Sequence, residues 1–401
     1  MMRFRWWSSI VLSAGCGPAL IGDAGDATSI AADDDTGSAS PTRGTVVAVG
    51  FPGSDGAPSF DAGTTDGVCT DAACFGPSQT LDDAAAWAVA IVDIDGDGVS
   101  EVIAGGEDEL RILSLAGDYA TLDVLGRVVA MATGRLDGDG VVDLVALTDA
   151  ARVVVVRGGS TPTVTSLAAA DGLTDVAIAN GDGSDPAFVT VAREGTVALW
   201  RSTDGGGWTP SFFGIAGNPA TVTVGTIADE LIVATGDDAH GRVDVLAIVG
   251  TSVLDAYEYP YFDNDPLQLE LGWLAPPGAI PDLLVLGDDP PALEVQRFAA
   301  GLDSMYTGAA LPLAGHPVAF ATGWLGYGER DVAIVDEQAG TVELCALVVA
   351  DEYAPQCPGA VLSVGAAPVA IAIGELAGGA PDDIAIASPR TGITLVTGTS
   401  G

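Results

Sequence analysis

Apolar and polar residues alternate along the chain in a unit that recurs from about residue 86 to the C-terminus. The two most similar copies cover residues 88–106 and 129–148, and each contains an apolar strand, a polar loop and a second apolar strand. Alternation with a period of two residues is typical of β-strands. A third strand follows each unit, as in ELRILSL and RVVVVRG, and a fourth, less regular segment leads to the next copy. The pattern predicts four short strands in every repeat.

The chain contains seven copies of this unit. Equivalent corner positions at the end of the first strand lie 42, 47, 44, 47, 51 and 51 residues apart: Val92, Gly134, Gly181, Gly225, Gly272, Gly323 and Gly374. Four strands in a repeat of roughly 40–50 residues are typical of a β-propeller. A parallel β-helix needs a shorter period, and an immunoglobulin-like array needs about twice as much chain per unit. We therefore expect an all-β fold, a seven-bladed β-propeller of four-stranded antiparallel blades over residues 77–401.

The seventh copy ends at the C-terminus, so its blade lacks an outer strand. Residues 77–83, PSQTLDD, resemble the outer-strand segment at residues 161–169, TPTVTSLAA. We expect residues 77–83 to complete blade seven and to join the two ends of the chain. This pairing would also remove an exposed edge strand, which invites pairing with other chains.

The first 15 residues have the pattern of a signal peptide. Arg3 and Arg5 precede a short apolar stretch at residues 6–12, which is far below the roughly 20 residues of a membrane-spanning helix. Residues 13–16 resemble a bacterial lipobox in which Cys16 would receive lipid, although Ser13 stands where the motif usually has Leu. The pattern predicts an exported protein, lipid-anchored in the cell envelope at the outer membrane or cell surface. Plain secretion and an unprocessed cytosolic N-terminus are the alternatives.

Residues 16–76 are rich in Gly, Ala, Ser, Thr, Asp and Pro, a composition typical of a flexible tether. A strand-like island, GTVVAVGF, interrupts this segment at residues 44–51. Beyond Cys16, four cysteines remain, which allow three pairings. The nearest-neighbour pairing, Cys69–Cys74 and Cys345–Cys357, is favoured because each pair lies in one short segment, and metal ligation by these thiols is the competing interpretation.

The charge of the chain limits its partners. There are 55 acidic residues and 14 basic residues, all of them Arg, for a net charge of −41. Such a surface cannot neutralise a run of phosphates, so nucleic acid is excluded as a main partner. Attraction to anionic lipids is excluded for the same reason, and only the N-terminal lipid would contact a membrane. We expect a monomer that binds a protein or a glycan.

The polar loop of the first copy has the spacing of a calcium site. Asp93, Asp95, Asp97 and Glu101 occupy positions 1, 3, 5 and 9, and the backbone carbonyl of Val99 lies at position 7. Hard oxygen ligands in a tight loop suit Ca²⁺ better than Zn²⁺ or copper. The alternative is a solvated acidic hairpin turn.

The later loops match this spacing less well. The second copy has Arg135 at position 1, followed by Asp137, Asp139, the carbonyl of Val141 and Asp143, and it predicts a weaker site. The third copy has a shortened loop, and in the other four copies the ligands have been lost. We therefore expect structural Ca²⁺ in blade one and, less firmly, in blade two.

The D-x-D-G-D-G-x-x-[DE] loop between two apolar strands, in seven copies, resembles the FG-GAP/VCBS repeats of integrin-α-like propellers. The resemblance covers about four-fifths of the chain. It implies a non-catalytic, extracytoplasmic propeller whose Ca²⁺ loops stiffen the blade hairpins. A fold-level resemblance does not identify the ligand.

Two aromatic features are candidates for a binding role. Trp273 and Trp324 occupy the same position in consecutive blades, where they would form a stacking platform for a sugar or an Arg side chain, or pack between neighbouring loops. Tyr257 and Tyr259 belong to an aromatic segment that forms either a protein-contact patch or part of the core. The sequence favours a surface-tethered binding or scaffold module over the alternative, an enzyme acting on surface polysaccharide through rim carboxylates.

Overall fold

The chain divides into two units, Met1–Thr42 and Arg43–Gly401. The computed structural model describes residues 46–48, 68–69, 73–117, 119–179, 187–203, 206–227, 230–259, 265–272, 282–298, 302–326, 331–348, 354–376 and 381–400, all in the second unit. The predicted signal peptide, Cys16, Trp273 and the third polar loop lie outside these residues. Within them, no helix is long and apolar enough to cross a membrane.

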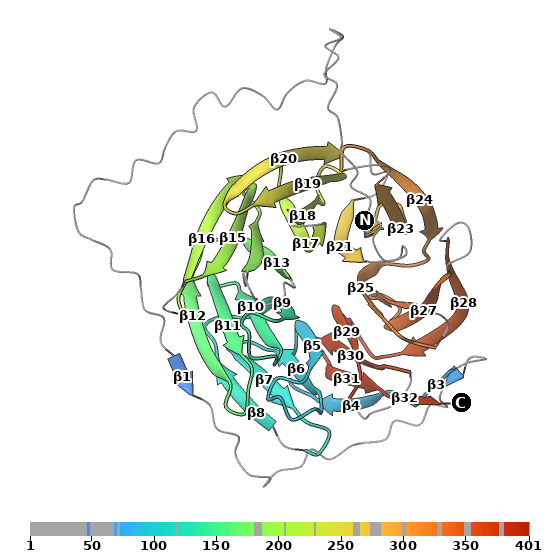
Figure 1. The fold of residues 1–401 in the computed structure, drawn as a ribbon. Coiled ribbons are helices and arrows are strands. Elements are labelled where there is room, and N and C mark those ends of the chain that lie inside the picture. The colour runs from blue at the N-terminus through green and yellow to red at the C-terminus, as the bar shows by residue number, and fades with distance from the viewer. Residues whose placement is uncertain are drawn as a thin grey trace, which may run out of the picture. The chain divides into compact units, whose positions relative to one another are not determined.

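Seven antiparallel four-stranded sheets form a ring (Figure 1). Blades one to six run from an inner strand to an outer strand in chain order, and blade seven has β4 as its outer strand. The strands of blades one to four are β5 (Ala88–Val92), β6 (Glu101–Gly105), β7 (Glu109–Leu113) and β8 (Tyr119–Asp123); β9 (Val128–Gly134), β10 (Asp143–Thr148), β11 (Arg152–Arg157) and β12 (Thr163–Ala168); β13 (Leu173–Ala179), β14 (Ala187–Ala192), β15 (Thr196–Ser202) and β16 (Trp208–Gly214); β17 (Pro219–Ile227), β18 (Glu230–Asp237), β19 (Arg242–Val249) and β20 (Ser252–Tyr259).

The remaining blades repeat this order. Their strands are β21 (Pro266–Gly272), β22 (Asp282–Asp288), β23 (Pro291–Phe298) and β24 (Met305–Pro312); β25 (Pro317–Gly323), β26 (Asp331–Asp336), β27 (Thr341–Val348) and β28 (Ala354–Ser363); β29 (Ala370–Gly374), β30 (Asp383–Ser388), β31 (Gly392–Val396) and β4 (Gln79–Asp82). The predicted all-β, seven-bladed propeller of four-stranded blades is confirmed.

The core is divided among the contacts between neighbouring blades. Each of seven hydrophobic clusters combines side chains of two adjacent blades, and the cluster of blades seven and one completes the circle. The second strand of a blade contacts a neighbouring sheet on each face, so it is apolar on both faces; all six residues of β10 and of β30 are buried. Apolar burial therefore holds every blade to two others.

Blade seven is completed from the N-terminal side of the chain. β4 pairs with β31 through Asp82–Ile393, Thr80–Thr394 and Gln79–Leu395, so it occupies the place proposed for residues 77–83. Arg111 of blade one fixes the segment that follows β4. Its Nε lies 2.6 Å from Asp82 Oδ2, and Nη2 donates hydrogen bonds to the carbonyls of Ala84 and Ala85 at 2.9 and 3.1 Å.

The segment predicted as a tether contributes three short strands. β2 (Val68–Cys69) and β3 (Ala73–Phe75) form a hairpin, and β3 pairs with β32 (Gly398–Ser400) at the C-terminus. β1 (Val46–Ala48), inside the strand-like island, adds to β12 as a fifth strand of blade two. The two ends of the chain are therefore joined in two sheets, blade seven and the β2–β3–β32 sheet.

The structure supports the predicted Cys345–Cys357 disulfide, which joins β27 to β28 with the two Cα atoms 4.0 Å apart. Cys74 is also disulfide-bonded, and Cys69 lies directly opposite it in the β2–β3 hairpin. Although Glu343 lies beside the Cys345–Cys357 pair, both of those sulfur atoms are in the disulfide. They are therefore not available as thiolate ligands for a metal.

Candidate functional site

The polar loop of blade one joins β5 to β6 and gathers three carboxylates. One oxygen from each of Asp93, Asp95 and Glu101 lies within 4.8 Å of the other two. Gly96 and Gly98 have φ values of 79° and 89°, a left-handed conformation that glycine adopts without steric cost. These two glycines fold the loop back on itself, which brings the first and last acidic residues of the motif together.

Carboxylates of the loop also accept hydrogen bonds from its own backbone amides. Asp93 accepts from Gly96 N at 2.7 Å through Oδ1 and from Gly98 N at 2.9 Å through Oδ2. Asp95 Oδ1 accepts from Asp97 N at 3.0 Å, and Asp97 Oδ1 accepts from Val99 N at 2.8 Å. These turns are the local reason that Asp at alternate positions, combined with Gly, wraps the loop.

Glu101 is the buried member of this group. Its side chain is at the start of β6, and Oε2 accepts a hydrogen bond from Ile94 N at 3.1 Å. Burial raises the Glu101 pKa to about 7, and the charges of Asp95, Asp93 and Asp97 add to the rise. Burial also raises the pKa of Asp95, with its acidic neighbours contributing. The loop therefore concentrates carboxylates whose ionised forms are unfavourable when the loop holds no cation.

An acidic residue at the start of the second strand recurs in blades that lack the rest of the metal motif. In four blades its carboxylate accepts a hydrogen bond from the amide of a buried aliphatic residue in the preceding loop. The pairs are Glu101–Ile94 (3.1 Å), Asp143–Leu136 (2.6 Å), Asp331–Leu325 (2.9 Å) and Asp383–Leu376 (2.9 Å). Sequence analysis missed this role because it assigned position 9 to metal alone. The signal is present in the sequence as an acid that begins the second strand even where positions 1, 3 and 5 carry no ligand.

Blade two shows how this role changes the interpretation of its loop. Both oxygens of Asp143 accept backbone amides, from Leu136 at 2.6 Å and from Gly158 at 2.9 Å, and burial raises its pKa to about 6. Asp137 and Asp139 form the same short amide turns as in blade one. Among the described residues, the three-carboxylate group within 4.8 Å is found in blade one and not in blade two. Blade two therefore resembles blade one in turn geometry rather than in ligand grouping.

The loops between first and second strands define one end of the ring, which we call the loop rim. Trp324 lies on this rim in blade six, and its side chain is 44% exposed. The backbone N–H of Trp324 donates to Asp382 Oδ2 of blade seven at 2.9 Å, and the backbone carbonyl of Trp324 accepts from Asp382 N at 2.8 Å. The backbone of this exposed aromatic residue is thus held by the neighbouring blade. The predicted pairing with Trp273 falls outside the described residues.

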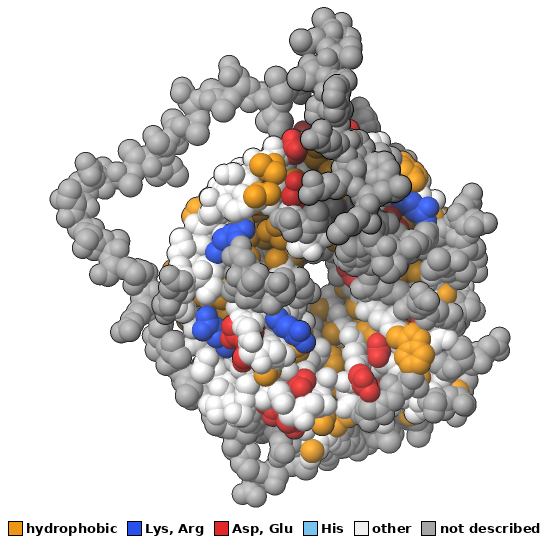
Figure 2. Space-filling view, viewed as in Figure 1, with side chains coloured by type: hydrophobic (Ala, Val, Ile, Leu, Met, Phe, Trp, Pro, Cys, Tyr) orange, Lys and Arg blue, Asp and Glu red, His pale blue; other side chains and the backbone are white. Residues whose placement is uncertain are grey.

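The inner strands of all seven blades line a central channel of about 420 Å³, and Figure 2 shows its opening. Asp175 is the single carboxylate among the described channel residues. It accepts from Val176 N at 2.8 Å in its own blade, and from Thr221 Oγ1 at 2.9 Å and Val222 N at 2.8 Å in blade four. Burial raises its pKa to about 6. Asp175 therefore joins blades three and four.

Another polar residue of the channel wall has a similar linking role. Gln268 of blade five donates to the carbonyl of Phe320 at 2.9 Å and accepts from its N–H at 2.8 Å, which joins blades five and six. A glycosidase of the common type needs two carboxyl groups flanking the scissile bond. The described channel lining provides one, and its oxygens already accept three hydrogen bonds.

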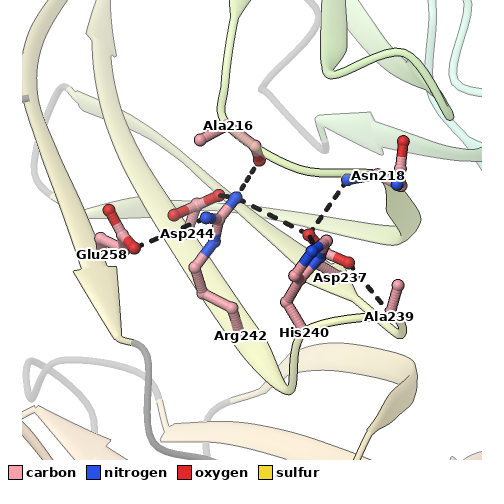
Figure 3. A network of polar contacts seen from close by, with 8 residues as sticks. All are labelled: Ala216, Asn218, Asp237, Ala239, His240, Arg242, Asp244 and Glu258. Atoms are coloured by element: carbon pink, nitrogen blue, oxygen red, sulfur yellow. Dashed lines mark hydrogen bonds and ion pairs between the residues drawn. The ribbon is translucent and has the colours of Figure 1, made fainter. Parts of the chain in front are cut away.

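A polar network occupies the opposite end of blade four, in the turn between β18 and β19 (Figure 3). Asp237 is buried and accepts from Asn218 N at 3.0 Å and from Ala239 N at 3.1 Å. Its Oδ2 also lies 2.9 Å from His240 Nδ1. His240 lies in the turn between β18 and β19, within blade four.

Arg242 extends this network to the outer strand. Its guanidinium contacts Asp244 at 3.0 Å and Glu258 at 3.5 Å, and it donates to the carbonyl of Ala216 (Figure 3). Burial raises the Asp244 pKa to about 6 despite the opposing charge of Arg242. The backbone part of the arrangement recurs in blade six, where Asp336 accepts from His316 N at 3.2 Å and from Ala339 N at 2.8 Å. It is a recurring turn of the fold rather than a site special to blade four.

The Tyr257 and Tyr259 side chains pack against the cluster between blades four and five, and Tyr259 donates a hydrogen bond to the carbonyl of Leu302. Of the two predicted roles for this aromatic segment, the described part supports the core role. The remaining aromatic residues of the segment, Tyr261 and Phe262, lie outside the described residues.

No family model and no curated protein matches the sequence. Several solved structures resemble the ring. The chain is similar to the RRP9 WD40 repeats, with a TM-score of 0.60, 12% identity, and coverage of 80% of this chain and 98% of that one. It is also similar to BBS1N in a crystal structure of its complex with ARL6DN, with a TM-score of 0.58, 11% identity, and coverage of 82% and 98%.

A third similar structure is streptogramin B lyase, with a TM-score of 0.53, 13% identity, and coverage of 79% of this chain and 94% of that one. At these identities the likeness shows the propeller fold alone. The resemblance of the polar loops to FG-GAP/VCBS repeats therefore stays a prediction.

Proposed function

We propose that the chain is a non-catalytic binding or scaffold propeller that recognises a protein or a glycan on its loop rim. The observation that supports this most is the contrast between the channel and the rim. The polar side chains Asp175 and Gln268 of the channel wall are engaged between blades, whereas Trp324 is exposed on the rim with its backbone fixed. A rigidly placed aromatic side chain is a typical anchor for a protein side chain or a sugar ring.

A protein ligand has additional support. BBS1N, which shares the ring architecture, is described in complex with ARL6DN, and propellers host many unrelated functions on one scaffold. The enzyme alternative receives less support, because the described channel residues include a single carboxylate. Streptogramin B lyase shares the fold at a lower TM-score, and its activity does not transfer at 13% identity.

The binding and enzyme functions can be separated in one assay. The mature chain is immobilised and exposed to envelope extract and to a glycan array, and both retention and new reducing ends are measured. We expect specific retention with no reducing ends above the background of heat-denatured protein. New reducing ends above that background would contradict the proposal and support the polysaccharide enzyme instead; their loss in Asp175→Asn would place the reaction in the channel, and their persistence would place it on the rim.

We also propose that the blade-one loop binds Ca²⁺ through Asp93, Asp95, Asp97, Glu101 and the Val99 carbonyl. The grouping of three carboxylates and the raised Glu101 pKa support this, because a divalent cation would relieve their mutual repulsion and Ca²⁺ prefers oxygen ligands. The residues present fit the ion. When bound, Ca²⁺ would supply a structural crosslink of the β5–β6 loop. A second ion held by Asp137, Asp139, Asp143 and the Val141 carbonyl is a weaker proposal.

Thermal unfolding with Ca²⁺ and with EDTA tests this site. Free Ca²⁺ at about 100 times its Kd should stabilise the folded chain by about 2.7 kcal/mol. Asp95→Ala should abolish most of that shift, while Asp137→Ala, the equivalent substitution in blade two, should remove only the smaller part that a second ion in blade two contributes. A melting temperature independent of Ca²⁺, or an unchanged shift in Asp95→Ala, would contradict the proposal.

The N-terminal segment supports a proposed location. A signal peptide at residues 1–15, lipidation at Cys16 and an intervening polar segment would place the propeller at the envelope surface, with secretion as the alternative. Intact-mass analysis of the mature chain distinguishes them, because a diacylated Cys16 adds the mass of its lipid and Cys16→Ser removes it. The disulfide at Cys345–Cys357 is consistent with an oxidising compartment.

A further inference from the structure

Among the described residues, no strand pairs with the outer edge of β20 (Ser252–Tyr259), the last strand of blade four. It lies on the outside of the ring between β16 and β24 (Figure 1). Leu254 is 53% exposed, Val253 is 36% exposed, and Val249 at the end of β19 is 44% exposed. Figure 2 shows hydrophobic side chains with acidic side chains beside them over this part of the ring. An edge strand with exposed apolar side chains is a template for pairing with another strand.

Other outer strands of the described blades are protected in ways that β20 is not. β12 is covered by β1, while β16 and β28 contain proline, which removes a backbone donor. β4 and β8 have only four and five residues. β24 is as long as β20, but its pairing shifts register near its middle, at Gly308. It contains no charged residue, so it offers no acidic side chain to a basic partner. In β20 the register shift lies near Leu254, so residues 255–259 pair regularly.

Acidic residues mark this edge. Asp255 and Glu258 lie on β20, and both are exposed. Glu258 pairs with Arg242, whose side chain is only 11% exposed and therefore offers little positive charge to the outside. Burial, followed by the charges of Asp255, Asp303 and Glu230, raises the Tyr257 pKa, which places these acids in one electrostatic neighbourhood. The edge thus combines open backbone groups, apolar side chains and negative charge.

We propose that β20 binds an extended, basic segment of a partner protein by strand addition. Main-chain hydrogen bonds would supply affinity, and Arg or Lys side chains opposite Asp255 and Glu258 would supply selectivity. The chain already contains one such addition, because β1 joins the outer edge of blade two. A second copy of this chain fits the edge poorly, since its net charge is −41. The edge is distinct from the loop rim, so either surface can be disproved without the other.

A designed peptide probes this edge directly. The probe is a seven-residue Val peptide with Arg at positions 2 and 5, the same three-residue spacing as Asp255 and Glu258, so that one Arg lies on each face of the added strand. It carries a fluorescent label and is titrated against the full chain by anisotropy at low and at high salt. We expect saturable binding, and we expect added peptide to slow amide hydrogen exchange in β20. The double substitution Asp255→Lys and Glu258→Lys should weaken binding about tenfold or more, through two lost ion pairs and added repulsion. Asp123→Lys, an equally exposed acid on the outer strand of blade one, should leave binding within about twofold.

A peptide control isolates the backbone contribution and leaves the protein unchanged. The same peptide with every backbone amide N-methylated retains its charges but cannot donate a main-chain hydrogen bond of a sheet from either edge. We expect it to bind at least tenfold more weakly. Equal affinity for both peptides would overturn the proposal in favour of diffuse charge attraction. Protection mapped away from β20, or protection of β20 by self-association without peptide, would overturn it as well.

Discussion

At the scale of single residues, the acid that begins the second strand of a blade connects loop and core. Asp383 is the clearest case, because one oxygen accepts from Leu376 N and the other from Gly398 N, both at 2.9 Å. Leu376 in turn packs in the cluster between blades seven and one. This carboxylate therefore holds a loop, a buried side chain and the C-terminal strand in one arrangement.

Removing this carboxylate should destabilise the ring. Asp383→Ala leaves two backbone amides without their acceptor in a buried setting, and we expect a loss of about 2–4 kcal/mol in the free energy of unfolding, measured by urea denaturation. Asp382→Ala, next to it in sequence, removes a single hydrogen bond to Trp324 N and should cost about 1 kcal/mol or less. Equal effects of the two substitutions would show that Asp383 has no special structural role.

Part of the candidate site could be predicted from single residues of the sequence. The Asp and Gly spacing at residues 93–101 predicted a loop that brings acids together, and three of them do meet. The second role of position 9 could not be separated from metal binding by spacing alone, since hydrogen bonding to Ile94 N and cation binding both require an acid there. The channel position of Asp175 was also hidden, because its partners Thr221 and Val222 lie 46 and 47 residues away.

At the scale of strands, β4 closes the ring, because it pairs with β31 as the outer strand of blade seven. Its pattern is alternating, with Leu81 buried between blades and Thr80 exposed. Sequence analysis found this strand through its likeness to an outer-strand segment, but not the β3–β32 pairing. Three-residue strands such as β32 are too short to show a period of two, and that pairing is stabilised by tertiary contact.

The closing strand offers a matched pair of substitutions. Leu81→Asp places a charge in the cluster between blades seven and one, and we expect a loss of about 3 kcal/mol or more in unfolding free energy. Thr80→Asp introduces the same side chain on the exposed face of the same strand and should change stability by about 0.5 kcal/mol or less. If urea denaturation shows equal losses for both, β4 does not close the ring in the way described.

At the scale of the whole molecule, seven interblade clusters hold the described blades together in a ring. The repeat period predicted this architecture, because each unit must bury both faces against its neighbours and seven units complete the circle. The ligand could not be predicted in the same way, since the strand pattern specifies packing rather than what an exposed rim recognises. The net charge of −41 adds one constraint and favours partners of opposite charge.

The most direct test of the account compares retention by Trp324→Ala with retention by the unaltered chain on envelope extract and glycan array. Phe212→Ala is the matched control, because Phe212 is an exposed aromatic residue on β16 that pairs with Ala198, toward the end of blade three opposite the loop rim. We predict that Trp324→Ala binds about tenfold or more weakly at unchanged melting temperature, and that Phe212→Ala binds as the unaltered chain does. Unchanged retention by Trp324→Ala would contradict recognition through the loop rim.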